Sequence, residues 1–571
     1  MKLRHLLIQN FRGIKSLDWL LGNDFVCLVG PGDSGKSTVL DAIDFALSRR
    51  WNLSFDDCDF FDCDVTSDIL IEATIGDLPE RALSDSLFGL RLRGIGGHPR
   101  VIHDEPEDGD EEVVTIRLSV TSSLEPHWSV VTDRHPEGMS ISASERERFG
   151  VARLGDYLDR DLSWKRGSTL SRITGEQDEH AHFLAEADRQ ARATIDSTQL
   201  PRMSKAAKHV EKLAARFGVN PRAGFVPAVD PGGSFGSVGL SLHDGNVPAR
   251  QAGLGTRRLV SLAMQRSISD DGGIVLVDEV ESGLEPFRLR RLLSELHTPS
   301  TSKDSDEPAI EPSTVVMTTH SPVALGQLRA AHVSVMRAEQ GAATVIQAAD
   351  DLQGVLITHA EAFLSRKVLV CEGATEMGIV TGLDQCWTES GEPPLAASGV
   401  ALANGGGATK VAEVAVAFRG LGYPTALLAD SDRALSRSTD ELSQAGINAQ
   451  IWAGEVCTEQ RIFSDLTWAA IARAVQLAID AEHPVREQVA AAMDVSPSTL
   501  AAQVSDWPQD HDETALRQAL ARSATSKSSP WFKNHRQGAR LGRIIAEHLP
   551  EITGTDLAVK IGALREWVTG E

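Results

Sequence analysis

The sequence predicts an α/β protein made of two successive domains, and three observations predict it. Near the N-terminus, an apolar strand runs into a glycine-rich loop and then a helix, in "FVCLVGPGDSGKST" (residues 25–38). Two further apolar strands, in "GIVLVDE" and "STVVMTTH", end in acids or a histidine. Far downstream, "KVLVCEG" and "PTALLADSD" repeat the pattern of an apolar strand that ends in carboxylates.

The composition is that of a globular protein with more than one core. The chain has 571 residues, of which 42% are hydrophobic and 24% are charged. No stretch approaches the roughly 20 uncharged apolar residues of a membrane span, so no membrane partner is expected. The six cysteines are scattered singly, which indicates reduced thiols and a cytoplasmic location.

The formal net charge of −24 argues on its own against a nucleic-acid partner. The charge is unevenly distributed, however. Residues 104–112 hold seven acids, whereas residues 522–543 carry six Lys and Arg residues and no acid. A local basic stripe matters more for phosphate contacts than the total charge does. A solvated helix face is the alternative explanation of the same charges.

The first glycine-rich loop matches the phosphate-binding pattern G-x-x-x-x-G-K-S. Its glycines let backbone amides surround phosphate oxygens, Lys36 reaches the β- and γ-phosphates, and the Ser37 hydroxyl binds Mg²⁺. The helix that follows points its N-terminus at the same anion. The loop therefore predicts an ATP site, with the candidate residues Gly30, Gly32, Gly35, Lys36, Ser37 and Thr38.

Three later segments supply candidates for the rest of the ATP site. Asp278 and Glu279 end an apolar strand, and such a pair gives one acid for Mg²⁺ and one to polarise water. His320 ends another strand, where it can sense a γ-phosphate; a structural histidine is the alternative. Gly253 and Gly255 open a helix whose amides can also meet an anion.

The order of these motifs resembles the ABC-type ATPase heads of SMC, RecF and OLD proteins. "GLGTR", "LVDEVESGLEP" and "TTHSP" follow the phosphate loop as in that family, and "IQNFRGIKSL" is similar to its first strands. The resemblance implies that the segment with Gly253 and Gly255 completes the ATP site of a second subunit in a homodimer. One feature departs from the family, because no glutamine occurs between Ser37 and Glu176. The acids of residues 54–64 are the candidates to stand in for the missing glutamine.

From residue 144 to residue 219 the apolar spacing becomes helical. SMC proteins have a long coiled coil here, whereas about 75 residues broken by Gly and Pro predict a short helical arm. In the resembling families such an arm often supports dimerisation, and plain core packing is the alternative. The predicted domains are an ATPase head over residues 1–352, with this insertion, and a second α/β domain over residues 353–571.

Carboxylates gather in the second domain. Glu372 ends one apolar strand, and Glu376 lies one helical turn further on. Asp430 and Asp432 end another strand, and since alternate strand residues share a face, both are expected to point the same way. Four carboxylates in one place cannot all be ionised without a cation, and hard oxygen ligands select Mg²⁺ or Mn²⁺. Two such ions about 4 Å apart serve phosphodiester cleavage; surface acids that cap strands are the alternative.

This arrangement resembles the Toprim domain of topoisomerases, primases and OLD-family nucleases. The glycine-rich "NGGGATK" between the acidic strands and the ATPase head in front strengthen the resemblance. It implies a parallel-sheet core over residues 366–466 and helices over residues 467–571. It also implies Glu459, rather than Glu455, as a further metal ligand. Lys533 is implied as a lysine that neutralises charge on the phosphate; DNA-backbone contact or a solvated lysine is the alternative.

The resemblance implies an OLD-family endonuclease that binds and hydrolyses ATP in the head and cuts DNA in the Toprim domain. The implied catalytic residues are Glu372, Asp430, Asp432, Lys533 and Glu279. Anti-phage systems such as Gabija use proteins of this architecture, so a defence role and a helicase or other defence-system partner are implied.

Two other functions compete with this interpretation. A topoisomerase needs a tyrosine nucleophile, and neither Tyr157 nor Tyr423 has a convincing context. The main alternative is an ATP-dependent DNA-binding repair protein similar to SMC and RecF, without nuclease activity.

Overall fold

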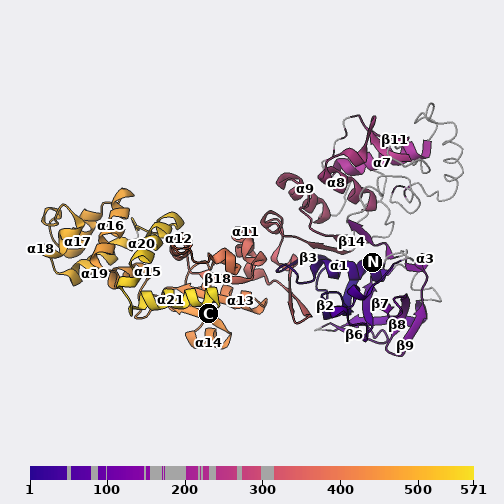
Figure 1. Cartoon of the computed structure of the whole chain (residues 1–571), viewed down its shortest axis with the longest axis horizontal. Helices are drawn as coiled ribbons and strands as arrows, with labels where there is room; N and C mark the ends of the chain where they lie inside the picture. Colours follow the sequence, from indigo (N-terminus) through magenta and orange to yellow (C-terminus); the bar gives the residue numbers. More distant parts are fainter. Residues whose placement is uncertain are drawn as a thin grey trace. The chain divides into compact units, whose positions relative to one another are not determined.

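The computed structural model describes residues 1–47, 53–78, 88–97, 100–146, 149–154, 170, 173, 201–216, 219, 221, 223–229, 240–266, 273–297, 314–526 and 528–570. These residues form two compact units, Met1–Ala348 and Ala349–Glu571 (Figure 1). The first unit ends four residues before the boundary expected after residue 352. Both units combine sheets with helices, so the predicted α/β class is confirmed.

The centre of the first unit is a run of five parallel strands. Their order is β10 (Ala152–Leu154), β14 (Ile274–Val277), β15 (Thr314–Thr318), β3 (Phe25–Val29) and β16 (Val333–Glu339). All residues of β14 and β15 are buried, which is typical of parallel strands. Because parallel strands end at the same edge of a sheet, the residues that follow β3, β14 and β15 are brought close together.

The remaining strands extend this sheet, mostly in antiparallel pairs. The order continues through β17 (Ala342–Gln347), β2 (Ile14–Leu20), β1 (Lys2–Phe11), β4 (Ile69–Gly76), β7 (Glu111–Val120), β5 (Arg93–Gly96) and β6 (Val101–His103), while β8 (Pro126–Thr132) pairs with β7 and β9 (His135–Ser140). Helix α1 (Lys36–Leu47) buries Val39, Leu40 and Ile43 in the core of this unit. The phosphate loop therefore lies between a buried strand and a buried helix.

The inserted segment differs in part from the sequence expectation. Residues 152–154, within the predicted helical segment 144–219, form β10 and pair with β14. A three-residue edge strand is too short to appear in the apolar spacing, which explains the wrong prediction there. Helix α7 (Pro201–Arg216) is followed by a small sheet of β11 (Phe225–Val229), β12 (Leu240–Asp244) and β13 (Val247–Pro248). Residues 155–169 and 174–200 of the predicted arm lie outside the described residues.

The second unit contains a four-stranded sheet in which all strands are parallel. Its order is β19 (Val400–Asn404), β18 (Lys367–Cys371), β20 (Thr425–Ala429) and β21 (Ile447–Ile451). The helices between these strands are α12 (Ala374–Glu389), α13 (Val411–Gly420) and α14 (Thr439–Gln444). The two central strands, β18 and β20, are the ones that the sequence predicts to end in carboxylates.

Helices complete the second unit. They are α15 (Thr458–Asp465), α16 (Trp468–Asp480), α17 (Val485–Met493), α18 (Trp507–Asp510), α19 (Glu513–Ala524), α20 (His535–His548) and α21 (Asp556–Thr569). A single core joins Leu369 of β18 and Ile379 of α12 with Trp531 and Leu541 of the last hundred residues. Of the helices in the described ranges, none is both long and apolar enough to cross a membrane.

Helices α12 and α20 approach each other so closely that only glycine fits at four positions. A Cβ atom on Gly382 would lie 2.1 Å from the carbonyl oxygen of Ala539, and one on Gly542 would lie 2.2 Å from that of Ile379. Gly378 and Gly538 are equally crowded, by His535 and Thr375 carbonyl oxygens at 2.4 and 2.5 Å. The two backbones are therefore in direct contact, which fixes α20 against the helix that follows Glu372.

We expect Gly542→Ala to lower the free energy of unfolding of the second unit by about 1–3 kcal/mol, because the added methyl group forces the two backbones apart. The measurement is thermal unfolding of the full chain. Gly562→Ala is the matched control, since nothing lies within 4 Å of a Cβ atom there. The control should raise stability by up to about 1 kcal/mol through helix propensity. Equal stability of the two variants would contradict this description of the helix contact.

Candidate metal centre and nucleotide site

The phosphate loop has the backbone conformation that its glycines predict. Gly35 has a φ of +91°, in the left-handed region that favours glycine. A Cβ atom on Gly30 would lie 2.3 Å from the carbonyl oxygen of Met336 in the neighbouring strand β16. Gly32 is exposed, with open space around it. The first helical residue after the loop is Lys36, as the pattern requires.

Lys36 closes the loop with its own side chain. Its Nζ atom donates to the carbonyl oxygens of Gly30 at 3.0 Å and Pro31 at 2.8 Å, and to the Ser34 hydroxyl at 3.4 Å. Burial lowers the pKa of Lys36, although nearby acids oppose the shift. A buried ammonium in a ring of amide groups is suited to bind a polyanion.

The structure brings the Ser37 hydroxyl to the acid at the end of β14. Ser37 Oγ donates to Asp278 Oδ1 at 3.2 Å, and the Thr318 hydroxyl donates to the same oxygen at 2.6 Å. Thr318 also accepts a hydrogen bond from the backbone of Glu279, whose φ of +45° is unusual for a non-glycine residue. Glu279 itself is exposed, and Thr38 is half-buried beside Ser37.

Two residues that the sequence patterns do not single out hold this edge together. Glu281 accepts hydrogen bonds from the Thr319 hydroxyl at 2.6 Å and from the backbone N–H of His320 at 2.7 Å. Arg258 donates to the carbonyl oxygen of Asp278 at 2.7 Å. Glu281 and Arg258 both contact segments that are distant in the chain, and no local sequence pattern predicts these contacts. The His320 side chain is exposed.

Of the two glycines in residues 251–264, only Gly255 has a role in packing. Helix α8 (Leu254–Arg266) begins directly after Gly253, and Gly255 is its second residue. A Cβ atom on Gly255 would lie 2.2 Å from the carbonyl oxygen of Gly283, so this glycine allows close contact within one chain. Gly253 is exposed and uncrowded.

Two acids of residues 54–64, the candidates to stand in for the missing glutamine, already have partners. Asp59 accepts a hydrogen bond from Arg12 Nε at 2.8 Å, and Asp56 accepts one from the backbone of Cys58 at 2.8 Å. The first contact joins the segment to the residue after β1, and the second lies within the segment.

In the second unit, three carboxyl-bearing segments meet at one edge of the parallel sheet. Glu372 follows β18 and accepts a hydrogen bond from the backbone N–H of Asp430 at 3.0 Å. Asp430 follows β20 and accepts from both the backbone and the hydroxyl of Thr458, at 2.8 and 2.6 Å. Thr458 is the first residue of α15, which carries Glu459. The predicted residues from β18, β20 and α15 are thus brought together.

Strand alternation does not orient Asp430 and Asp432, which corrects the expectation from the sequence. Strand β20 ends at Ala429, so strand alternation does not extend to either aspartate. Asp430 is only 7% exposed, whereas Asp432 lies in the following bend and is exposed.

Two glutamates in this region are buried, and one of them has no hydrogen-bond partner among the described residues. Glu376 lies in the first turn of α12 and is 5% exposed. Glu459 is 1% exposed, and neither of its carboxylate oxygens has a hydrogen-bond partner. Burial of a carboxylate without partners is costly, so this arrangement requires a compensating charge. Glu455, the other candidate in this segment, is exposed.

The buried acids also act on one another. Burial raises the pKa of Glu376, and the charges of Glu459 and Glu372 add to the effect. Burial likewise raises the pKa of Asp430 to about 8, and Glu376 is the next largest cause. Mutual repulsion of this kind favours either protonation or a bound cation.

One cation of the chain approaches this group. Lys533 Nζ lies 3.6 Å from Glu459 Oε1, and the lysine side chain is 53% exposed. Burial lowers the pKa of Lys533, but Glu459 and the other acids outweigh it and raise the pKa overall. The single positive charge of Lys533 does not neutralise the four carboxylates of Glu372, Glu376, Asp430 and Glu459. The oxygen-rich set, with a Glu459 carboxylate that has an ion pair but no hydrogen bond among the described residues, therefore fits a divalent cation such as Mg²⁺ or Mn²⁺.

The carboxylates of this group are too far apart to coordinate one metal ion together. Across the described parts of the chain, no three His, Cys, Asp or Glu side chains converge closely enough to hold an ion as they stand. The separation of these acids is compatible with the repulsion between like charges.

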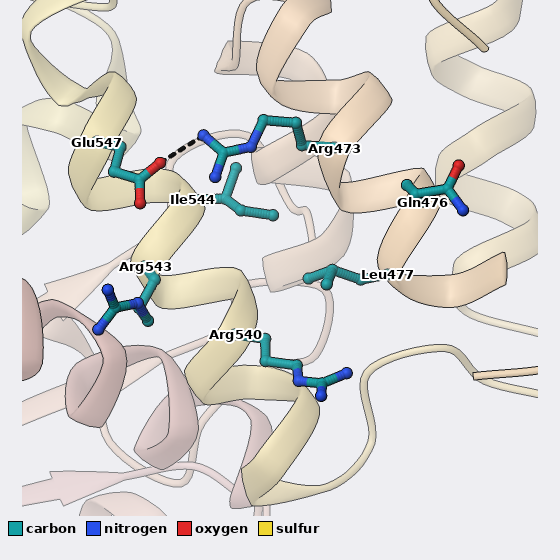
Figure 2. A pocket seen from close by; sticks show the side chains of 7 residues that line it. All are labelled: Arg473, Gln476, Leu477, Arg540, Arg543, Ile544 and Glu547. Carbon is teal, nitrogen blue, oxygen red and sulfur yellow. Dashed lines mark hydrogen bonds and ion pairs between the residues drawn. The ribbon is translucent and has the colours of Figure 1, made fainter. Parts of the chain in front are cut away.

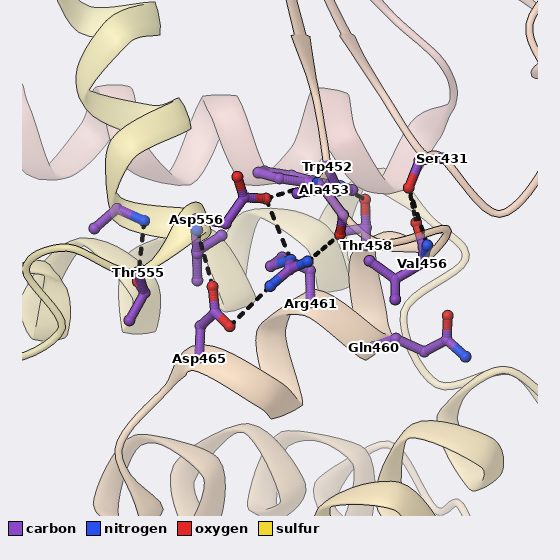
Figure 3. A network of polar contacts seen from close by, with 12 residues as sticks. Ser431, Trp452, Ala453, Val456, Thr458, Gln460, Arg461, Asp465, Thr555 and Asp556 are labelled. Carbon is purple, nitrogen blue, oxygen red and sulfur yellow. Dashed lines mark hydrogen bonds and ion pairs between the residues drawn. The ribbon is translucent and has the colours of Figure 1, made fainter.

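A polar network holds the loop before Glu459 in place (Figure 3). Arg461 forms ion pairs with Asp465 at 3.1 Å and Asp556 at 3.4 Å, and it also donates to the carbonyl oxygen of Ala453. The Ala453 backbone in turn donates to Asp556 at 2.9 Å. The first turn of α21 thus supports the segment that presents Thr458 to Asp430.

The glycine-rich loop after β19 supports the same edge. The backbone N–H of Gly405 donates to Cys371 at 2.8 Å, and that of Gly407 donates to the carbonyl oxygen of Glu372 at 2.9 Å. A Cβ atom on Gly405 would clash with Val411 at 2.5 Å. The loop therefore fixes the backbone from which Glu372 projects.

Two families match the chain, one in each unit. Residues 25–326, more than half of the chain, match the family described as "AAA domain, putative AbiEii toxin, Type IV TA system". Residues 363–432 match "Overcoming lysogenization defect protein-like, TOPRIM domain". These matches confirm the predicted combination of an ATPase domain with an OLD-like Toprim domain.

Individual relatives are more distant. The chain is 26% identical over 347 residues to the OLD nuclease of Thermus scotoductus (strain ATCC 700910 / SA-01), which covers 56% of this chain and 59% of that protein. The match thus spans less than two thirds of the relative. An SmcHead bound to the C-winged helix domain of ScpA is similar at 14% identity and a TM-score of 0.38, covering 61% of this chain and 97% of that one. The SMC head domain from Thermotoga maritima is similar at 14% identity and a TM-score of 0.30, covering 61% and 100%.

We expect Asp430→Asn to stabilise the metal-free protein at pH 8. The folded state raises the pKa of this carboxyl from 3.8 to about 8, so its contribution to stability is lost as pH rises between these values. The amide removes that loss, and the melting temperature in EDTA should rise by roughly 2–4 °C per kcal/mol recovered.

Asp432→Asn is the matched control in EDTA, since Asp432 is exposed and its charge loss should change the melting temperature little. Mn²⁺ should then stabilise the wild type more than Asp430→Asn. A lower melting temperature for Asp430→Asn than for the wild type in EDTA would contradict the description of the buried acids.

Proposed function

Because this chain belongs to the AAA-domain family matched over residues 25–326 and carries an OLD-like Toprim domain, we propose that it is an ATP-dependent DNA endonuclease. The proposed reaction is hydrolysis of a phosphodiester bond, which cuts or nicks DNA with two divalent cations. The observation that carries the proposal is the group of buried acids around Glu459, whose carboxylate has no hydrogen-bond partner. Such a group is costly in the free protein, and a cation compensates it.

The ligands proposed for Mg²⁺ or Mn²⁺ are Glu372, Glu376, Asp430, Asp432 and Glu459. Bound divalent cations supply the positive charge that activates a water molecule and stabilises the leaving oxygen. Lys533, 3.6 Å from Glu459, is suited to pair with a non-bridging oxygen of the scissile phosphate. The Thr458 hydrogen bonds hold Asp430 in a fixed orientation while phosphorus bonds to the water oxygen and separates from the sugar oxygen.

In the head, we propose that the phosphate loop, including Gly30, Gly32, Gly35 and Thr38, binds the phosphates of ATP. The oxygens that Lys36 Nζ now contacts would give way to the β- and γ-phosphates. Ser37 and Asp278, joined by a hydrogen bond, are the proposed Mg²⁺ ligands. Glu279 would polarise the attacking water, and His320 would sense the γ-phosphate.

The proposed assembly is a homodimer in which Gly253 and Gly255 of one subunit complete the ATP site of the other. The proposed biological role is bacterial anti-phage defence, with DNA as substrate and a helicase or another defence protein as partner. These proposals rest on the resemblance of the motif order to OLD-family proteins, and the relative from Thermus scotoductus is a nuclease by name.

The nuclease proposal predicts that the wild type converts supercoiled plasmid to nicked or linear DNA with Mg²⁺ or Mn²⁺. Asp430→Ala should lower the rate by about 100-fold or more, because it removes a buried metal ligand. Glu455→Ala is the matched control. It removes an exposed acid four residues before Glu459 and should cut at the wild-type rate. Agarose gel electrophoresis measures all three.

A wild type that leaves the plasmid supercoiled with both metals, with or without ATP and with its partner supplied, would contradict the nuclease proposal. DNA binding without cutting would instead favour an ATP-dependent repair protein similar to SMC and RecF.

The nucleotide site predicts that Lys36→Ala weakens ATP binding by roughly 10- to 100-fold, since charged hydrogen bonds to the phosphates are lost. Titration calorimetry with the full chain measures the dissociation constant. Lys15→Ala, which removes an exposed charge from β2, is the matched control and should bind ATP as the wild type does. Equal affinity of Lys36→Ala and the control would exclude this loop as the ATP site.

A further inference from the structure

Helix α20 carries a row of cations that begins at the acidic centre, the name used here for Glu372, Glu376, Asp430 and Glu459. Lys533 lies two residues before the helix, and Arg536 and Arg540 follow on its exposed side at a spacing of four residues. The opposite side of α20 is buried, through Leu541, Ile545 and the glycines that contact α12. The segment of residues 522–546 contains no acid. The cations of α20 therefore share one face of a firmly packed helix.

The far end of this face opens into a groove of about 340 Å³ between α16 and α20 (Figure 2). The groove is lined by Arg473, Gln476, Leu477, Arg540, Arg543, Ile544 and Glu547. Two of its three arginines are neutralised. Arg473 pairs with Glu547, and Arg543 pairs with both carboxylate oxygens of Glu389 at 2.7 and 2.8 Å.

Arg536 and Arg540 differ from these two arginines. No side-chain hydrogen bond or ion pair joins either of them to another of the described residues, and both are exposed. Figure 2 shows Arg540 in the groove without a contact to the other lining side chains. Exposed guanidinium groups without partners are the groups that phosphate binds, often in two hydrogen bonds.

We propose that Arg536 and Arg540, together with the groove between α16 and α20, bind the sugar–phosphate backbone of the DNA substrate beside the cleavage site. This inference rests on the proposed nuclease function and specifies how that site holds its substrate. One helical turn separates the two arginines by about 6 Å along α20. Phosphates of one strand rise by about 3.4 Å each along the duplex axis, so with α20 parallel to that axis the two arginines match phosphates about two nucleotides apart.

The distance from the acidic centre sets the register of this contact. Arg540 lies five residues after His535, the first residue of α20, which is roughly 7.5 Å along the helix axis. Because glycine contacts fix α20 to the helix that carries Glu376, the phosphate contacts and the acidic centre keep a constant separation.

The test is DNA binding by the full chain in EDTA, where cutting is blocked. The anisotropy of a short fluorescein-labelled duplex is measured over a range of salt concentrations. The double variant Arg536→Ala, Arg540→Ala should bind about tenfold more weakly, and the slope of log K against log salt should fall by about 1.8, or 0.9 for each lost contact. Arg522→Ala, an exposed arginine of the same acid-free segment on α19, should retain both values.

Wild-type affinity and slope in the double variant would overturn the proposal, as would a wild type that does not bind DNA. An equal melting temperature of the double variant and the wild type shows that both are folded. If the protein binds DNA through these arginines but cuts nothing with any metal, the nuclease proposal fails and the phosphate-binding groove stands. If it cuts DNA while the double variant binds normally, only the groove proposal fails.

Discussion

The backbone contact between α12 and α20 is the constraint on which the second unit depends. Helix α12 begins two residues after Glu372 and carries Glu376, whereas α20 begins two residues after Lys533. The two helices are far apart in the sequence, and four glycines allow them to touch. A hydrogen bond from the Thr375 hydroxyl to the carbonyl oxygen of Phe532, at 3.0 Å, also joins the segment of the lysine to the start of α12. The helical segments of the C-terminal part thus belong to the same core as the parallel sheet.

The buried acids around Glu459 are kept at the expense of local electrostatic stability, and hydrogen bonds and an ion pair nearby offset that cost. Asp430 is held by two hydrogen bonds from Thr458, and the loop before Thr458 is held by Arg461 and Asp556. None of these contacts neutralises the buried charge of Glu459. The surrounding fold is therefore strong enough to hold like charges close together, which is common at sites that bind metal ions.

Local patterns predict the parts of the protein that depend on local sequence. The phosphate loop, β18 and β20 are contiguous motifs, and the acids that follow these strands could be named because parallel strands end at one edge. Thr458 and Glu281 could not be named, since each acts through a hydrogen bond to a segment remote in the chain. Strand β10 is too short to show a period, and the end of β20 at Ala429 depends on tertiary structure rather than on apolar residues. Glycines at four-residue spacing are visible in the sequence, but their partner helix is not.

Glu281 has a consequence for how the edge of the first unit can move. Its two carboxylate oxygens are each occupied, one by the Thr319 hydroxyl and the other by the backbone of His320. The stretch after β14 and the stretch after β15 are therefore tied by one side chain. A displacement of the histidine away from its present place must break that tie or carry the stretch after β14 along with it. We therefore expect Glu281 and His320 to move together, although about forty residues separate them in the chain.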